Sequence, residues 1–152
     1  GYGLLLDGNR LTDPNVAGEA RAMGQALASA RLSPEDVDYI NAHGTSSVLG
    51  DATEVAAIKE VFGGNRDRIW LNSTKSLTGH CLTAAGSIEA IAAIVQINGG
   101  FVHPNLNLRQ PIDDRCRFVG TQSQPAAIQV ALSNSFGFSG INGSIALKRW
   151  KE

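Results

Sequence analysis

The chain has 152 residues, which is enough for one domain with a hydrophobic core and too few to expect two. With 18% charged residues and a net charge of −1, the composition gives no reason to expect a nucleic-acid or a membrane partner. We see no targeting segment and expect no apolar run to reach the ~18 residues that a membrane-spanning helix needs. Two cysteines without a secretory signal favour a reducing compartment, so we expect a cytoplasmic protein.

Apolar residues recur with the periods of strands and helices in alternation. In chain order, the predicted elements are a strand at 1–6, a polar turn at 7–10, a helix at 18–30, a strand at 37–42, a helix at 51–62, a strand at 69–72, a helix at 84–98, and strands at 129–133 and 144–149. This order predicts an α/β fold for residues 1–152, with helices layered on a mixed β-sheet.

The helix at 84–98 is apolar nearly all round, which is typical of a helix covered on several sides. A domain of this size can scarcely cover it alone, and residue 1 is Gly1 rather than Met, so we expect a longer protein with a further domain upstream. Glu89 lies in the middle of this helix, and an isolated buried carboxylate is costly. We therefore expect a cationic partner for it, with Lys75 as the candidate.

Three polar clusters follow predicted strands, at 43–45, 73–80 and 134–138. Because ligands of open α/β sheets bind beyond the carboxyl ends of strands, these clusters are candidates for one pocket. Taken alone, His43 is better explained as a core or turn histidine and Lys75 as a surface lysine. The two aromatic residues in the loop at 136–140 favour a lid or a pocket wall over a solvated turn.

Metal and phosphate sites find little support in the spacing of the residues. His43, His80 and His103 show no i, i+4 or HxH spacing and no CxxC accompanies them, so we expect no metal. Neither GxxxxGK[ST] nor GxGxxG occurs, so a phosphate-binding loop is not indicated.

Three long motifs, in this order, resemble the signatures of β-ketoacyl synthases. They are YINAHGTSS at 39–47, NSTKSLTGH at 72–80 with AAG at 84–86, and NSFGFSG at 134–140. The resemblance runs nearly end to end, and it implies the carboxy-terminal half of a thiolase-like fold. It also implies a β-ketoacyl-ACP synthase, an acyltransferase of fatty-acid or polyketide biosynthesis that works as a homodimer.

The family condenses malonyl-ACP with an acyl thioester held on a cysteine, after decarboxylating the malonyl group. By motif match, His43 and His80 are the two catalytic histidines, and Lys75 and Glu89 match the family lysine and the acidic residue beyond it. The partner implied is acyl carrier protein, whose phosphopantetheine arm carries the substrates, so no cofactor is expected.

The resemblance assigns three further positions. Thr45 and Ser47 match the residues that bind the phosphopantetheine arm, although the family more usually has threonine at the second. Phe138 matches the gating phenylalanine. Ser139 and Ile141 depart from the commoner glycine and its polar neighbour, which bears on the mobility of the gate.

The nucleophilic cysteine of the family is missing, because it belongs to the amino-terminal half. Neither Cys81, directly after His80, nor Cys116, among charged residues, matches its surroundings, so we expect this chain alone to be inactive. Two alternatives stay open: a ketosynthase-like malonyl-ACP decarboxylase without the cysteine, and a non-catalytic subunit that shapes a chain-length cavity. The intact histidine and lysine set argues against the second.

Overall fold

A computed structural model describes residues 1–8 and 11–150. The strands are β1 (Tyr2–Leu6), β2 (Tyr39–Asn41), β3 (Trp70–Asn72), β4 (Phe101–Val102), β5 (Arg117–Phe118), β6 (Gln124–Pro125), β7 (Val130–Gly137) and β8 (Ile141–Lys148). The α-helices are α1 (Val16–Ala30), α2 (Val48–Phe62), α3 (Lys75–Thr78) and α4 (Ala85–Gly99). Short 3-10 helices are η1 (Pro34–Asp36), η2 (Gly63–Asp67), η3 (Leu82–Ala84) and η4 (Phe138–Gly140).

The main sheet is mixed, as the sequence predicted. Its strand order is β1-β8-β7-β2-β3-β5, in which β1, β8 and β7 are antiparallel and β7, β2, β3 and β5 are parallel. A small antiparallel pair of β4 and β6 stands apart from it. Because β2 and β3 run parallel side by side, their carboxyl ends meet at the same edge of the sheet.

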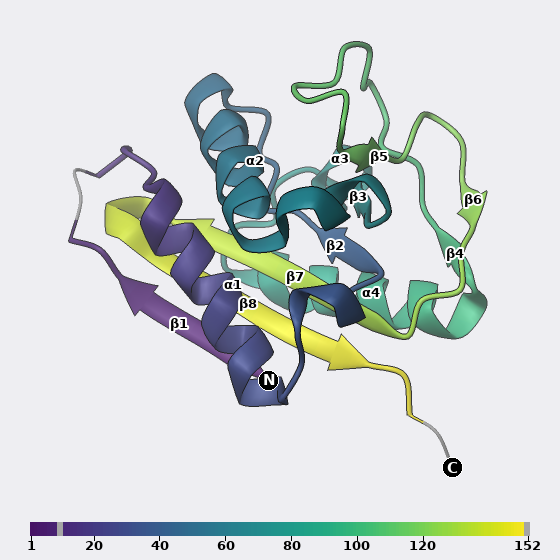
Figure 1. The fold of residues 1–152 in the computed structure, drawn as a ribbon. Helices are drawn as coiled ribbons and strands as arrows, with labels where there is room; N and C mark the ends of the chain where they lie inside the picture. The colour runs from purple at the N-terminus through teal and green to yellow at the C-terminus, as the bar shows by residue number, and fades with distance from the viewer. Residues whose placement is uncertain (9–10, 151–152) are drawn as a thin grey trace.

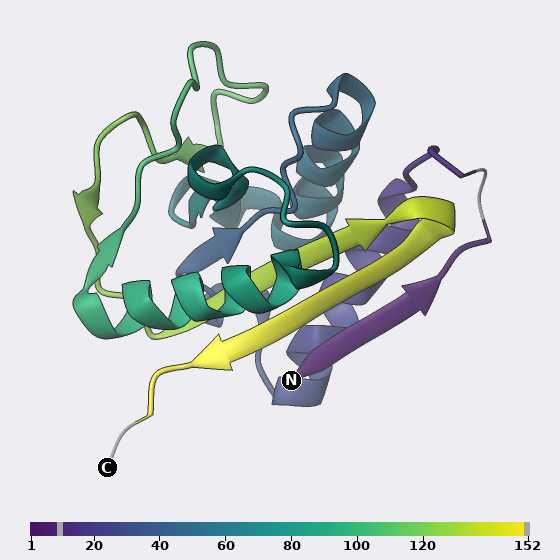
Figure 2. The same ribbon diagram turned by 180° about the vertical axis from the view of Figure 1, so that it is seen from behind.

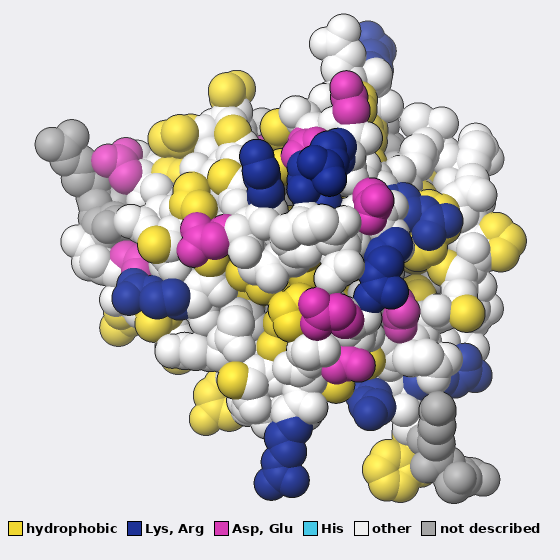
Figure 3. All heavy atoms as spheres, viewed as in Figure 1, with side chains coloured by type: hydrophobic (Ala, Val, Ile, Leu, Met, Phe, Trp, Pro, Cys, Tyr) yellow, Lys and Arg dark blue, Asp and Glu magenta, His cyan; other side chains and the backbone are white. Residues whose placement is uncertain are grey.

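Helices cover both faces of this sheet (Figures 1 and 2). Helices α1 and α2 pack on one face and share a core with the inward residues of β2, β3 and β7. Helix α4 lies along β7 on the other face and closes a second, smaller core around Tyr39 and Ile128. On the face formed by α1 and α2, charged side chains lie among apolar ones (Figure 3). The layered α/β architecture predicted from the sequence is therefore confirmed.

Helix α4 is only partly covered by the chain itself. Its inner side, with Glu89, Ala93 and Gln96, is buried, whereas Ile91 and Val95 on its outer side are 61% and 53% exposed. Next to it, the apolar side chains of β1 are exposed as well. The helix therefore has the apolar outer side that the sequence predicted, and the rest of this chain leaves it open.

The expectation that no apolar run has the length of a membrane-spanning helix was wrong. By length and composition alone, the segment Leu82–Gly99 meets that criterion. In the structure this segment is a layer of the α/β fold, with a buried carboxylate on its inner side and β7 beneath it (Figure 2).

The late hairpin also differs from its prediction. Strand β7 continues through Phe136 and Gly137, and β8 begins already at Ile141, so only Phe138–Gly140 connects them. Paired residues of β7 and β8 extend from Val130–Lys148 to Gly137–Ile141. Pairing between the strands therefore continues into the glycine-rich segment that its composition had predicted to be a loop. The polar turn expected at 7–10 lies partly outside the described residues.

Candidate active site

A buried carboxylate holds the backbone around His43. His43 follows β2, and its amide donates to Glu54 Oε1 (2.9 Å), while the Gly44 amide donates to Glu54 Oε2 (2.9 Å). Asn134 of β7 donates to the same carboxylate (3.1 Å). Glu54 lies on the inner side of α2, so this helix fixes the chain that leaves β2. Sequence reasoning missed Glu54, although the burial argument applied to Glu89 fits an acidic residue on the inner side of a helix equally well.

His43 and His80 come together although they stand 37 positions apart. Their ring centroids are 5.8 Å apart and the rings are nearly perpendicular, at 86°. We expected His80 at the end of a strand, but it follows α3, the short helix after β3. Its Nδ1 accepts a hydrogen bond from the Leu82 amide (3.0 Å), which leaves the proton of a neutral ring on Nε2.

His43 is a neutral imidazole in this environment. Burial first, then the positive charge of Lys75 and the neighbouring His80, together lower the pKa of His43 to about 3. The Phe136 ring, 6.0 Å from that of His43, forms part of its apolar surroundings. A neutral ring has one N–H and one bare nitrogen, so His43 can donate a hydrogen bond without carrying charge.

The pair expected from burial cost is present. Lys75 begins α3 and its Nζ forms an ion pair with Glu89 Oε1, and both side chains are buried. Burial raises the pKa of Glu89, while the hydrogen bond and charge of Lys75 oppose this rise. Asn41 at the end of β2 donates to the other oxygen, Glu89 Oε2 (3.3 Å). Lys75 is therefore a buried lysine with a partner, and its interpretation as a surface residue is wrong.

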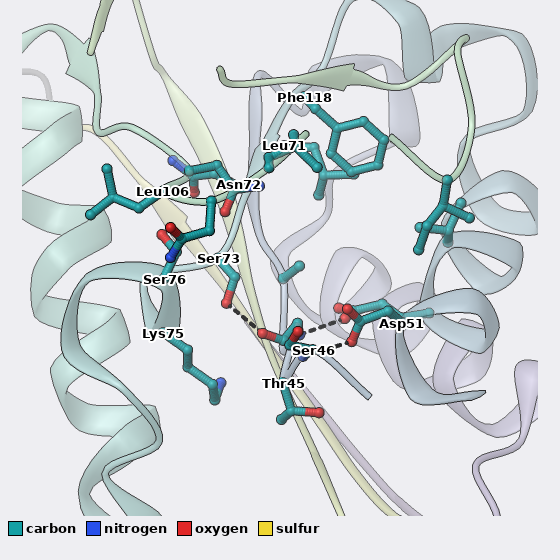
Figure 4. A pocket seen from close by; sticks show the side chains of 18 of the residues that line it. Thr45, Ser46, Asp51, Leu71, Asn72, Ser73, Lys75, Ser76, Leu106 and Phe118 are labelled. Atoms are coloured by element: carbon teal, nitrogen blue, oxygen red, sulfur yellow. Dashed lines mark hydrogen bonds between the residues drawn. The ribbon is translucent and has the colours of Figure 1, made fainter. Parts of the chain in front are cut away.

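A cavity of about 600 Å³ opens where β2 and β3 end (Figure 4). Its lining includes Thr45, Ser73, Lys75 and His80, together with the loop at 105–110. Thr45 Oγ1 lies 3.4 Å from Ser47 Oγ. Ser47 itself is exposed and caps α2 by accepting from the Gly50 amide (3.2 Å), so its hydroxyl already has a structural partner.

Phe138 lies outside this cluster. Its side chain is 70% exposed on the connection between β7 and β8, and Phe136 is the aromatic residue beside His43. Ser139 has the left-handed backbone conformation (φ 59°), which glycine adopts without strain, so the structure explains why glycine suits this position. The Ser139 amide donates to the Leu11 carbonyl (2.9 Å), which ties the connection to the segment after β1.

The two cysteines are both free. Cys116 is buried and its pKa is raised, first by burial and then by the charge of Asp113. Cys81 is partly buried, and its Sγ lies near the carbonyl groups of Thr78 and Gly79. Neither lies on the strand-to-helix elbow of an acyl-accepting thiol, and the raised pKa of Cys116 is the opposite of what such a thiol needs.

The sequence model of the family described as "Beta-ketoacyl synthase, C-terminal domain" matches residues 1–109. The chain belongs to the β-ketoacyl synthase family. The order of the three motifs and the meeting of His43 with His80 agree with this membership. The resemblance noted from the motifs is thus confirmed, and so is the thiolase-like fold of the carboxy-terminal part.

Relatives with two different activities match almost the whole chain. The polyketide biosynthesis malonyl-ACP decarboxylase PksF of Bacillus subtilis (strain 168) is 43% identical over 97% of this chain and 35% of its own length. A 3-oxoacyl-[acyl-carrier-protein] synthase 2 of Synechocystis sp. is 43% identical over 99% of this chain and 37% of its own length. The chain therefore spans about a third of the length of these curated relatives.

A solved structure shares the fold closely. The type II polyketide ketosynthase AntDE, in complex with its acyl carrier protein AntF, superposes with a TM-score of 0.90 at 38% identity. The match covers 99% of this chain and 38% of that chain. The layers and the strand order described above are thus those of a ketosynthase.

Proposed function

We propose that the protein to which this chain belongs is a β-ketoacyl-ACP synthase that decarboxylates malonyl-carrier with His43 and His80. The observation that supports it is the pair of nearly perpendicular imidazoles 5.8 Å apart, of which His80 lines the cavity at the strand ends. His43 is neutral, and the Nδ1 of His80 is occupied as an acceptor. Two N–H groups can then be aimed at one oxygen atom of a ligand.

Such a pair suits the loss of carbon dioxide from a malonyl thioester. The bond to the carboxylate breaks, its electrons move into the thioester as an enolate, and negative charge grows on the thioester oxygen. Donors that meet this oxygen stabilise the transition state more than the ground state, by about 2.7–4 kcal/mol for one donor in comparable sites. In a synthase, the enolate carbon then attacks an acyl thioester on a cysteine outside this chain, and the cysteine leaves as a thiolate.

The carrier is the expected partner. AntDE was solved with an acyl carrier protein, so the fold can dock one. We assign Thr45 and Ser47 to the phosphopantetheine arm because Thr45 lines the cavity and its hydroxyl lies beside that of Ser47. The reaction then needs no cofactor of the enzyme's own, and we expect it to run in a cytoplasmic homodimer.

A second candidate is a malonyl-ACP decarboxylase that performs only the first half of this chemistry. The identity of 43% to PksF, equal to that with the synthase from Synechocystis, supports it. The two functions differ in the residue at the nucleophile position, which lies outside this chain.

The test measures carbon dioxide release from malonyl-carrier by the full-length protein and by His43→Ala and His80→Ala. We expect each variant to lose about 10²-fold or more in kcat, while carrier affinity stays within about twofold, because each donor acts mainly in the transition state. Equal turnover in all three proteins contradicts the proposal. Adding an acyl-carrier separates the candidates: a synthase forms the β-ketoacyl product, and a decarboxylase forms acetyl-carrier alone.

A further inference from the structure

The third histidine, His103, is buried away from the pair and takes part in a different polar cluster. It follows β4, its amide donates to Gln96 Oε1 (2.9 Å), and its carbonyl accepts from Asn72 Nδ2 (2.7 Å). Its ring Nε2 lies 2.9 Å from Thr74 Oγ1. Backbone and ring are thus both held, so the imidazole meets Thr74 in a defined orientation.

From Thr74 the contacts continue to the ion pair of Lys75. The amide and the hydroxyl of Thr74 both lie within hydrogen-bonding distance of Asn41 Oδ1, at 3.0 and 2.7 Å. Asn41 Nδ2 then donates to Glu89 Oε2 (3.3 Å) and to Ser133 Oγ (3.2 Å). A continuous series of contacts therefore links His103 to the carboxylate that pairs with Lys75, and Lys75 follows Thr74 directly in the chain.

The protons in this series decide its direction. Asn41 Nδ2 is turned towards a carboxylate, so Asn41 Oδ1 is the acceptor at its other end. The single proton of the Thr74 hydroxyl is then used on Asn41 Oδ1, and Thr74 Oγ1 can only accept from the ring of His103. This requires a proton on Nε2 of His103.

The other ring nitrogen, Nδ1, has two neighbours, of which one favours this tautomer and the other favours a proton on Nδ1. Nδ1 lies 3.2 Å from Asn72 Nδ2, a donor whose orientation is set because Asn72 Oδ1 accepts from the Tyr39 hydroxyl (2.7 Å). It also lies 2.8 Å from the Pro104 carbonyl, which favours a proton on Nδ1. Burial lowers the pKa of His103, so the ring carries one proton, and the requirement of Thr74 places that proton on Nε2.

We propose that His103 is a positioning residue whose Nε2–H donates to Thr74 and so directs a chain of donors through Asn41 onto Glu89, the carboxylate that holds Lys75. The consequence for activity rests on the proposed decarboxylation. Each link points a proton towards the carboxylate, and hydrogen bonds in such a chain strengthen one another. The chain fixes Glu89 and with it the Lys75 charge that acts on His43.

The first test uses the full-length enzyme and the variants Thr74→Val, which removes the hydroxyl, and His103→Phe, with Thr74→Ser as the control that keeps it. We expect kcat for malonyl-carrier decarboxylation to fall about tenfold in the first two variants, with KM within about twofold, because neither residue meets the substrate. Thr74→Ser should stay near wild type. If either of the first two variants folds and keeps the wild-type kcat, or changes only KM, the proposal is wrong.

The second test needs no variant. A nitrogen-15 NMR spectrum of the imidazoles in the wild-type protein, recorded between pH 6 and 8, should show His103 protonated on Nε2 and unprotonated on Nδ1. A proton on Nδ1 contradicts the proposal even if neither substituted protein folds. If the wild-type enzyme releases no carbon dioxide, the proposed function fails, and the spectrum still judges the donor chain by itself.

Discussion

The ion pair of Lys75 with Glu89 allows a sharp test of the energetics of this site. The two side chains are 5% and 1% exposed, so Glu89→Ala leaves an ammonium group buried without its counter-ion. Breaking a buried pair from one side costs about 3–5 kcal/mol. Asn41 Nδ2 also loses one acceptor, although it keeps Ser133. We therefore expect Glu89→Ala to lower the free energy of unfolding by about 3–5 kcal/mol.

The matched control replaces both charges, as Lys75→Met with Glu89→Leu. No charge is then left buried without a partner, and such replacements are often neutral or stabilising by about 1–4 kcal/mol. The assay is urea unfolding of the full-length protein, with the two single variants completing a double-mutant cycle. The reasoning is refuted if Glu89→Ala lies within about 1 kcal/mol of wild type, or if the double variant is the least stable protein of the set.

Three further outcomes follow from the structure. Because burial, Lys75 and His80 lower the pKa of His43 to about 3, its NMR shifts should stay constant from pH 8 to about 5, and a titration near 6.5 in the folded protein contradicts the assignment. The unfolded chain takes up a proton near the usual pKa of 6.5, so the stability that this neutral histidine contributes is lost as pH falls below that value. Burial, with the charges of Glu54 and Asp7, raises the pKa of Glu19 to about 9, so the folded state keeps a proton that the unfolded state releases above about pH 4.5, and Glu19→Gln should raise the melting temperature at pH 8 but not at pH 4. Gly44 has φ +41° and an added Cβ would lie 2.7 Å from Ser73 Cβ, so Gly44→Ala should cost about 1–3 kcal/mol and reduce activity, whereas Gly64→Ala, where nothing lies within 4 Å, serves as the control.

Much of the fold follows from local patterns. The strand at 1–6 and the helices at 18–30, 51–62 and 84–98 were all found within about three residues of their predicted bounds, because apolar periodicity records which side of an element is buried. The boundaries of β7 and β8 were not, since pairing between two strands depends on residues that lie opposite one another in space.

The candidate site divides in the same way. The pairing of Lys75 with Glu89 could be predicted, because the cost of burying a lone carboxylate is a property of the residue and its apolar helix. The specific role of Glu54 could not, because its three donors come from the segment after β2 and from β7, and they meet its carboxylate on α2 only in the folded chain. The assignment of Phe138 as the gating phenylalanine stays a prediction: its side chain is exposed in this chain, and Phe136 is the aromatic residue beside His43.

By itself, the sequence determined the α/β class, the family and the residue types that its chemistry needs, since these depend on periodicity and on motifs that are local in the chain. The tertiary structure alone decided that two histidines meet at 5.8 Å and that a third one lies in the hydrogen-bond network behind Lys75. The physical reason is that parallel strands bring distant segments to one edge of the sheet, where burial, charge and the count of available protons then assign each side chain its state.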